Sequence, residues 1–128
     1  MSPRVNISTD NAPAAIGPYS QAIAHGGVLY CSGAIPLDSA GELVGANDAA
    51  EQARQCLRNL DAVAAAGGGE LAEALQVTVY TTLLEEFPGI NEAYAEFFDD
   101  PPPARVTIGV SALPKAVLVE ISALVPLK

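Results

Sequence analysis

The chain has 128 residues, of which half are hydrophobic and 16% are charged, and its net charge is −9 at pH 7. We expect residues 1–128 to form a single domain with one core, because this composition is typical of a compact soluble protein rather than a disordered acidic segment. With 6 Lys and Arg against 15 Asp and Glu, the chain lacks the basic surface that attracts nucleic acid or anionic lipid, so neither is an expected partner.

The start of the chain lacks the apolar run of a signal peptide, and no stretch reaches the roughly 20 apolar residues of a spanning helix. We therefore expect a cytoplasmic protein. Its two cysteines, Cys31 and Cys56, have no metal-type spacing and are predicted to be buried and reduced. The single histidine, His25, lies beside a Gly-Gly turn, so neither a zinc site nor a histidine-based triad is expected. Any chemistry would use carboxylates, hydroxyls, arginine and backbone groups, with no cofactor.

Three short strands are predicted in the first third of the chain, at residues 4–8, 20–25 and 28–32. The last two are separated by Gly26-Gly27, a two-residue turn that suits a hairpin. A proline-rich loop over residues 12–18 leads to Tyr19, and a surface loop with at most one small hairpin is predicted over residues 35–47.

Two amphipathic helices follow. The first is predicted to begin at a capping box of Asp48 and Glu51 and to end at Gly67-Gly68-Gly69. Its apolar stripe consists of Ala49, Ala53, Cys56, Leu57, Leu60, Val63 and Ala64. After a helical turn within residues 70–75 and a strand at 77–82, the second helix follows Phe87-Pro88 and is predicted to run until Pro101-Pro102-Pro103 stops it. Its apolar side consists of Ile90, Ala93, Tyr94, Phe97 and Phe98.

The last quarter of the chain contains two extended segments, residues 103–110 and 117–124, whose short proline-containing connection predicts a hairpin. Arg105 opens the first segment, and Glu120 interrupts the otherwise apolar second one. A charge inside an apolar strand is costly unless it is paired, hydrogen-bonded or solvated in a cleft. These two residues are therefore the leading site candidates, and an ion pair between them is the structural alternative.

Two helices can cover only one face of a sheet, yet several strands are apolar on both faces. The second face therefore needs its own cover, which predicts association between copies of the chain through the sheet. Glu120 would then lie at or near an interface, where ligand clefts are common.

Five ordered blocks of the sequence match a known pattern: Gly17-Pro18-Tyr19-Ser20, Ser32-Gly33-Ala34-Ile35-Pro36, Asn91-Glu92-Ala93-Tyr94, Pro103-Ala104-Arg105 and Val119-Glu120-Ile121. From about residue 5 to the C-terminus, the chain resembles the RidA (YjgF-type) family of reactive enamine/imine deaminases. The resemblance implies a chorismate-mutase-like α+β fold with a mixed sheet and two helices on one face. It also implies a homotrimer with a barrel-like interior and three ligand clefts between subunits.

The resemblance also implies a role for each matching residue. Arg105 would hold the carboxylate of a small 2-imino or 2-keto acid, since a guanidinium binds a carboxylate with two hydrogen bonds. Glu120 would activate the water that attacks the C=N bond, and the backbone N–H of Gly33 would join the grip on the carboxylate. Polar cleft positions would be Tyr19, Ser32 and Asn91. Without the resemblance, each of these positions has an ordinary structural explanation. Tyr19 would be a packing residue, Ser32 a hydroxyl at a strand end, Gly33 a turn residue and Asn91 a solvent-facing amide.

The chain departs from the family pattern in three places, one of which is the connection after the first helix, Gly67-Gly68-Gly69-Glu70-Leu71-Ala72. Many members carry a cysteine two residues after the arginine, where this chain has Thr107. This excludes a thiol nucleophile there, although the hydroxyl and backbone of Thr107 can still line the substrate cleft. Ala34 replaces a common glutamine, which leaves the range of substrates open.

The function implied is a 2-iminobutanoate/2-iminopropanoate deaminase that needs neither metal nor cofactor and converts 2-aminoacrylate-type intermediates to 2-keto acid and ammonia. Two alternatives stay open: a non-catalytic trimeric binder of small 2-keto acids, and a deaminase of the 2-aminomuconate type. The label ribonuclease or translation inhibitor, which some members carry, fits poorly with the net charge of −9.

Overall fold

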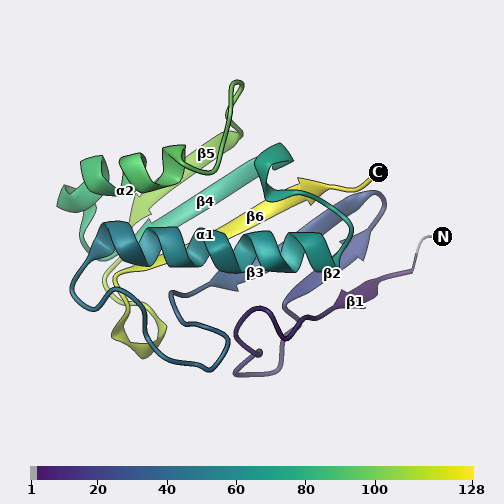
Figure 1. Cartoon of the computed structure of the whole chain (residues 1–128), viewed down its shortest axis with the longest axis horizontal. Helices are drawn as coiled ribbons and strands as arrows, with labels where there is room; N and C mark the ends of the chain where they lie inside the picture. Colours follow the sequence, from purple (N-terminus) through teal and green to yellow (C-terminus); the bar gives the residue numbers. More distant parts are fainter. Residues whose placement is uncertain (1–2) are drawn as a thin grey trace.

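Six strands form one mixed sheet, and both helices pack against the same face of it (Figure 1). The computed structural model describes residues 3–128. The strand order is β1-β2-β3-β6-β4-β5. The strands are β1 (Val5–Ile7), β2 (Ala22–His25), β3 (Val28–Ala34), β4 (Gln76–Thr81), β5 (Ala104–Gly109) and β6 (Val119–Pro126). The helices are α1 (Ala49–Ala66) and α2 (Phe87–Ala95), with short 3-10 turns η1 (Leu71–Glu73), η2 (Leu84–Glu86) and η3 (Pro114–Ala116). The predicted α+β class with two helices on one face is confirmed.

The hairpin predicted at Gly26-Gly27 is present, and the one predicted between the last two strands is wrong. Gly26 and Gly27 have φ of +60° and +80°, the left-handed values that a type I′ turn requires. Strand β4 lies between β5 and β6, parallel to the first and antiparallel to the second. The inner face of β6 is fully buried, which requires a place within the sheet, whereas β5 is exposed enough to form an edge. Closeness in sequence therefore did not decide pairing here.

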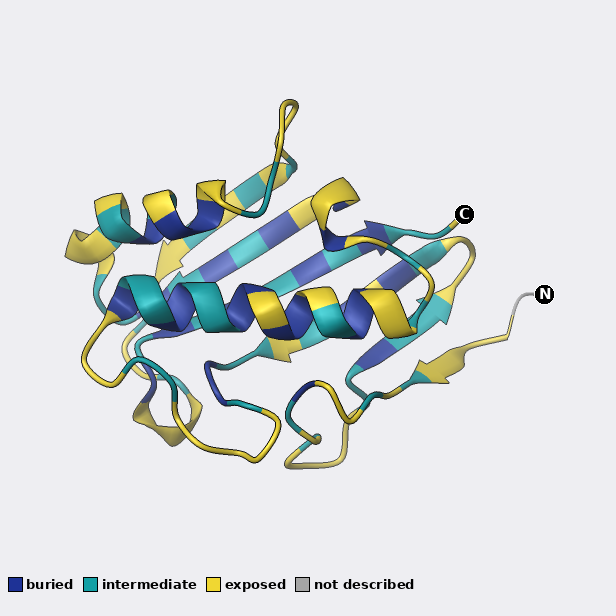
Figure 2. Ribbon diagram, in the orientation of Figure 1, coloured by how far each residue is buried: buried dark blue, intermediate teal, exposed yellow. Residues whose placement is uncertain are grey.

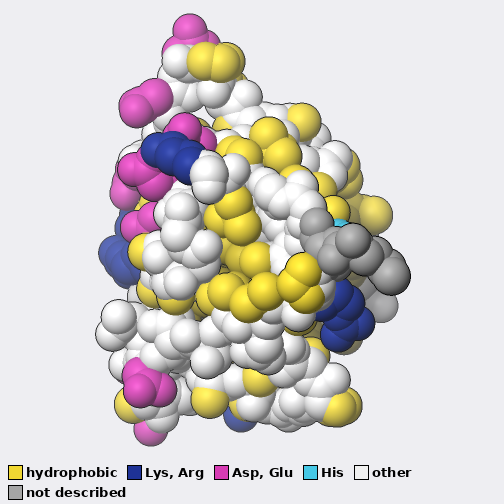
Figure 3. Space-filling model, turned by 90° about the vertical axis from the view of Figure 1, so that its right-hand side faces the viewer, with side chains coloured by type: hydrophobic (Ala, Val, Ile, Leu, Met, Phe, Trp, Pro, Cys, Tyr) yellow, Lys and Arg dark blue, Asp and Glu magenta, His cyan; other side chains and the backbone are white. Residues whose placement is uncertain are grey.

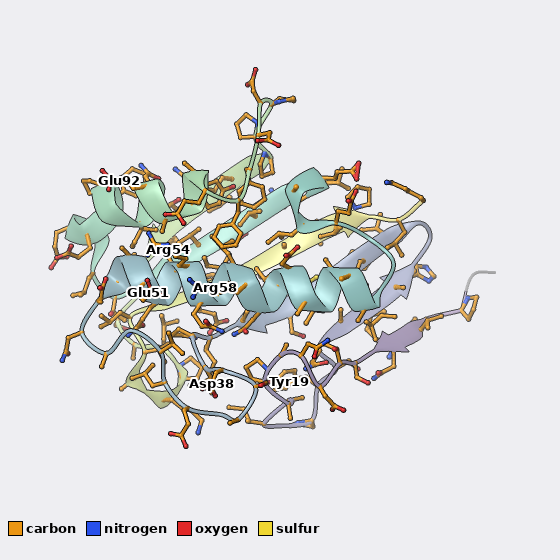
Figure 4. All side chains as sticks on the ribbon, in the orientation of Figure 1. Tyr19, Asp38, Glu51, Arg54, Arg58 and Glu92 are labelled. Carbon is orange, nitrogen blue, oxygen red and sulfur yellow. The ribbon has the colours of Figure 1, made fainter. Side chains whose placement is uncertain are left out.

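Helix α1 follows its predicted limits. Asp48 is the N-cap, and its Oδ1 accepts a hydrogen bond from the N–H of Glu51 at 3.0 Å. The carboxylate of Glu51 does not complete the capping box and instead binds Arg54 at 2.7 Å, on the outer side of the helix (Figure 4). At the other end, Gly69 and Gly68 donate to the carbonyls of the last turn in a Schellman motif. Every residue of the predicted apolar stripe is buried.

Helix α2 ends at Ala95, five residues before the prolines that were expected to stop it. Its last turn tightens, because the N–H groups of Glu96 and Phe97 donate to carbonyls three residues back, at 3.2 and 3.1 Å. The acidic residues Asp99 and Asp100 then lie in the loop that leads to β5. The side chain of Arg54 links this end of α2 to α1 through Glu96, with a shortest distance of 2.7 Å.

The hydrophobic core fills the space between the helices and the inner face of the sheet (Figure 2). Cys31 and Cys56 are both buried and free, as predicted, and burial raises the pKa of Cys31 to about 12. Within residues 3–128 there is no cluster of residues suited to hold a metal, and no helix is long and apolar enough to cross a membrane.

The opposite face of the sheet, which we call the open face, carries no helix. Large apolar side chains stand on it with nearly half of their surface exposed: Tyr30 (47%), Val106 (45%) and Ile108 (46%). The register places Ile108 and Glu120 on either side of Tyr80, in one row across this face. At the end of the molecule shown in Figure 3, hydrophobic side chains also occupy the middle, and Asp and Glu lie mainly along the left edge. The predicted uncovered apolar face is therefore present.

Candidate active site

Glu120 lies on the open face of the sheet. Its neighbours in β6, Val119 and Ile121, are fully buried against the helices, so strand alternation turns Glu120 the other way. Its carboxylate has no hydrogen-bond or ion-pair partner among residues 3–128, and partial burial raises its pKa above the ordinary value of 4.5. A depression of about 320 Å³ surrounds it, which we call the Glu120 depression. It is lined by Ile16, Tyr19, Ser32, Gly33, Ile35, Pro114 and Glu120.

Gly33 provides the space that the Glu120 carboxylate occupies. A Cβ atom built on Gly33 would overlap Oε2 of Glu120 and lie 2.8 Å from its Cδ. The glycine stands where the register between β3 and β6 shifts, between Cys31 and Ala34. A side chain at this position would therefore displace Glu120.

Tyr19 and Ser32 both border the Glu120 depression. Ser32 donates from its hydroxyl to the carbonyl of Ser20 at 2.6 Å, which ties β3 to the preceding loop. The hydroxyl of Tyr19 accepts from the N–H of Ile16 at 3.2 Å, and the residue is 47% exposed on that loop (Figure 4). The proline-rich loop is thus fixed at the rim of the depression. Pro114 of η3 also lines it, although no sequence signal singled it out.

Arg105 lies on the opposite face, beneath α2. It pairs in register with the buried Val77 of β4, and its Nη1 donates to Oδ1 of Asn91 at 2.8 Å. No carboxylate of the described chain lies within ion-pair distance of its guanidinium, so the alternative of an Arg105–Glu120 ion pair is wrong. Arg105 also lines a second hollow, the Arg105 depression. This is lined by Asn91, Tyr94, Ala95, Phe98, Asp99, Asp100, Pro102, Pro103 and Arg105.

Thr107 and Asn91 lie on the same side of the sheet as Arg105. Thr107 lies two residues beyond Arg105 on the same face of β5, and its hydroxyl is buried without a hydrogen-bond partner among residues 3–128. Asn91 accepts from Arg105 through its side-chain oxygen and also lines the Arg105 depression. Phe87 and Tyr94 of α2 also contact the guanidinium, with ring centroids 5.3 and 4.7 Å from its Cζ. These two aromatic contacts were not predicted.

One chain does not bring Arg105 and Glu120 together. Arg105 of β5 pairs with Val77 of β4, and Val77 pairs with Ala123 of β6. Glu120 is therefore two strands away from Arg105 and three residues away along the strand direction. Standard strand spacings separate the two Cα atoms by about 14 Å. The side chains also point to opposite faces. A small ligand that touches both therefore requires two copies of the chain.

Comparison with known proteins agrees with the resemblance. The sequence profile described as Endoribonuclease L-PSP matches residues 9–126. A RutC family protein of Sinorhizobium fredii, y4sK, is 51% identical over 122 residues, which cover 94% of this chain and 96% of that protein. A 2-iminobutanoate/2-iminopropanoate deaminase of Dermatophagoides farinae is 39% identical over 125 residues, which cover 98% of each chain.

Solved structures match over nearly the whole chain. RidA from the Antarctic bacterium Psychrobacter sp. PAMC 21119 has a TM-score of 0.92 at 38% identity, covering 97% of this chain and 100% of that one. Escherichia coli TdcF with bound serine has a TM-score of 0.90 at 38% identity, covering 97% and 99%. The chain therefore belongs to the RidA/YjgF family, whose profile carries the description endoribonuclease L-PSP.

Proposed function

We propose that the protein is a cytoplasmic deaminase of small 2-imino acids that works as a homotrimer without metal or cofactor. Arg105 of one subunit binds the substrate carboxylate, and Glu120 of a neighbouring subunit accepts a proton from water as the water oxygen attacks C2 of the imine. The C–N bond then breaks, and the nitrogen leaves as ammonia after it has been protonated. One imine and one water thus give one 2-keto acid and one ammonia.

One observation carries the proposal: a desolvated carboxylate and an arginine with free donors lie on opposite faces of one sheet. The desolvated carboxylate suits a general base, because a raised pKa brings it closer to the operating pH. The arginine suits an anion, because its remaining donors have no acceptor among residues 3–128. Packing of the β5 and α2 edge of one copy against the open face of the next would bring the two residues to a shared cleft. The activity in the name of the relative from Dermatophagoides farinae, and the serine bound to TdcF, are consistent with a small substrate that has a carboxylate.

The surroundings of Arg105 favour a monocarboxylate. Asp99 and Asp100 line the same depression, so a second carboxylate on the substrate would meet like charges there. This disfavours a dicarboxylic substrate such as 2-aminomuconate. The same acidic residues oppose the approach of an RNA backbone to Arg105.

A coupled assay tests the proposal. A serine or threonine dehydratase generates the imine, semicarbazide traps it competitively, and keto-acid formation is followed with and without this protein. The expected result is faster keto-acid formation. R105A should weaken keto-acid binding by about 1.5–3 kcal/mol, roughly 10- to 150-fold. E120Q should slow turnover while it preserves binding. No acceleration by the wild-type protein would remove the deaminase proposal, and keto-acid binding that persists would then favour the non-catalytic binder.

A further inference from the structure

Three side chains on one side of α2 contact the guanidinium of Arg105. Phe87, Asn91 and Tyr94 lie four and three residues apart, which places them along one face of the helix. All three contact the guanidinium: the two rings at 5.3 and 4.7 Å from its Cζ, and Asn91 by a hydrogen bond of 2.8 Å. No other arginine of the described chain has an aromatic ring over its guanidinium.

Three side chains on one face of α2 converge on the guanidinium. Two of them present ring centroids within 5.3 Å of Cζ, and Asn91, which lies between Phe87 and Tyr94 in sequence, accepts from Nη1. The planar cation is therefore held by two rings and by a hydrogen bond at one edge.

This arrangement leaves the rest of the cation to a ligand. A guanidinium has five N–H donors, and the hydrogen bond to Asn91 uses one of them. The rings attract the cation by cation–π interaction but accept no conventional hydrogen bond from these donors. The remaining donors are therefore available to a ligand in the Arg105 depression, which Arg105 itself lines. The conformational entropy of the long side chain is therefore already lost before a ligand binds.

We propose that Phe87 and Tyr94 are positioning residues that preorganise Arg105 for the substrate carboxylate, an inference that rests on the proposed function. The ring of Tyr94 performs this task and its hydroxyl does not, because that hydroxyl is buried without a hydrogen-bond partner among residues 3–128. Burial raises the pKa of Tyr94, so it stays neutral at physiological pH.

Matched variants test the proposal through binding of 2-oxobutanoate by calorimetry and through kcat and KM in the coupled assay. F87L and Y94L should each raise Kd and KM by about 2- to 30-fold with little change in kcat. Y94F, which keeps the ring, should stay within about twofold of wild type. F97L is the control, because Phe97 is a half-buried residue just after the same helix with no contact to Arg105. In an R105A background, Y94L should have no further effect on KM.

A measurement without ligand keeps this inference separate from the proposed function. In wild-type protein, ring currents should shift the Arg105 side-chain proton resonances upfield, and F87L and Y94L should each remove part of this shift. Unchanged Arg105 resonances in both leucine variants would overturn the inference even if the enzyme is active. Equal losses of affinity in Y94F and Y94L would also overturn it, because the hydroxyl would then be the important group. If the resonances shift as expected but the protein neither binds 2-oxobutanoate nor turns over imine, the proposed function is wrong. The positioning of Arg105 by Phe87 and Tyr94 is then still supported.

Discussion

Glu120 combines partial burial with the lack of a cationic partner in the described chain, and burial therefore raises its pKa. The folded protein binds this proton more tightly than the unfolded chain. The stability contributed by protonation is thus fully present below the ordinary pKa of 4.5 and is lost as the pH rises through the raised value.

The matching prediction concerns E120Q, which removes the desolvated charge at every pH. Its urea midpoint should exceed that of wild type at pH 7, and the difference should shrink towards pH 4, where wild-type Glu120 becomes protonated. The acid limb of kcat/KM in the wild-type protein should lie above the pH range of an ordinary glutamate. A difference in urea midpoint that does not vary with pH would contradict this account of Glu120.

Gly33 makes a separate prediction, because its missing side chain is the space that Glu120 occupies. G33A should move the carboxylate and reduce kcat by about 10- to 100-fold, since small misplacements of a reacting group have effects of that size. The fold should survive, because the displaced atoms are the end of a flexible side chain. The control is A34G, which makes the reverse change at the neighbouring position. G26A is unsuitable as a control, because Gly26 has φ of +60° and alanine would strain the backbone there. Full activity in G33A would contradict the assigned contact.

At the scale of elements, α1 depends on its N-cap residue, Asp48, for a defined start. D48A should lower the free energy of unfolding by about 1 kcal/mol, because it removes the acceptor for the N–H of Glu51. Urea unfolding measures the loss, and D61A, an exposed residue within α1, should change stability by less than about 0.5 kcal/mol. Equal effects of the two substitutions would mean that the Asp48 cap contributes nothing specific.

The sequence was sufficient for elements whose signals are local. The Asp48 cap, the glycines after α1, the Gly26-Gly27 turn and the apolar stripe of α1 all depend on neighbouring residues, and all were predicted correctly. The place of β5 depends on long-range packing, so proximity in sequence gave a false hairpin with β6. The end of α2 was missed because the chain leaves the helix before the prolines, at a tightened turn that has no strong breaker.

The candidate site was predicted in its parts but not in its arrangement. Arg105 and Glu120 stood out because a charge in an apolar strand is costly unless it is hydrogen-bonded or solvated. In the structure Arg105 is hydrogen-bonded to Asn91, and Glu120 lies in a depression. That they occupy opposite faces follows from the register through β4, which the sequence does not state. The aromatic contacts of Arg105 were missed because Phe87 and Tyr94 have the spacing of ordinary core residues.

For the whole molecule, the open face predicts association. I108D should change the mass in light scattering from three chains to one, because the charge would be buried between copies at the row that contains Glu120. L43D is the control, since Leu43 has the same 46% exposure but lies in a loop away from the strands. A monomeric wild-type protein, or a trimer that persists in I108D, would contradict association through this face.

The central claim is that each active site takes Arg105 from one subunit and Glu120 from another, and complementation tests it most directly. R105A and E120Q proteins, each with reduced activity alone, are unfolded together at equal concentration, refolded and assayed for imine hydrolysis. In a closed ring of three clefts, random mixing should give about a quarter of the sites both native residues, and activity should return to about that fraction of wild type. Refolding each variant separately before mixing provides the control. Co-refolded protein that is no more active than either parent would contradict the shared site.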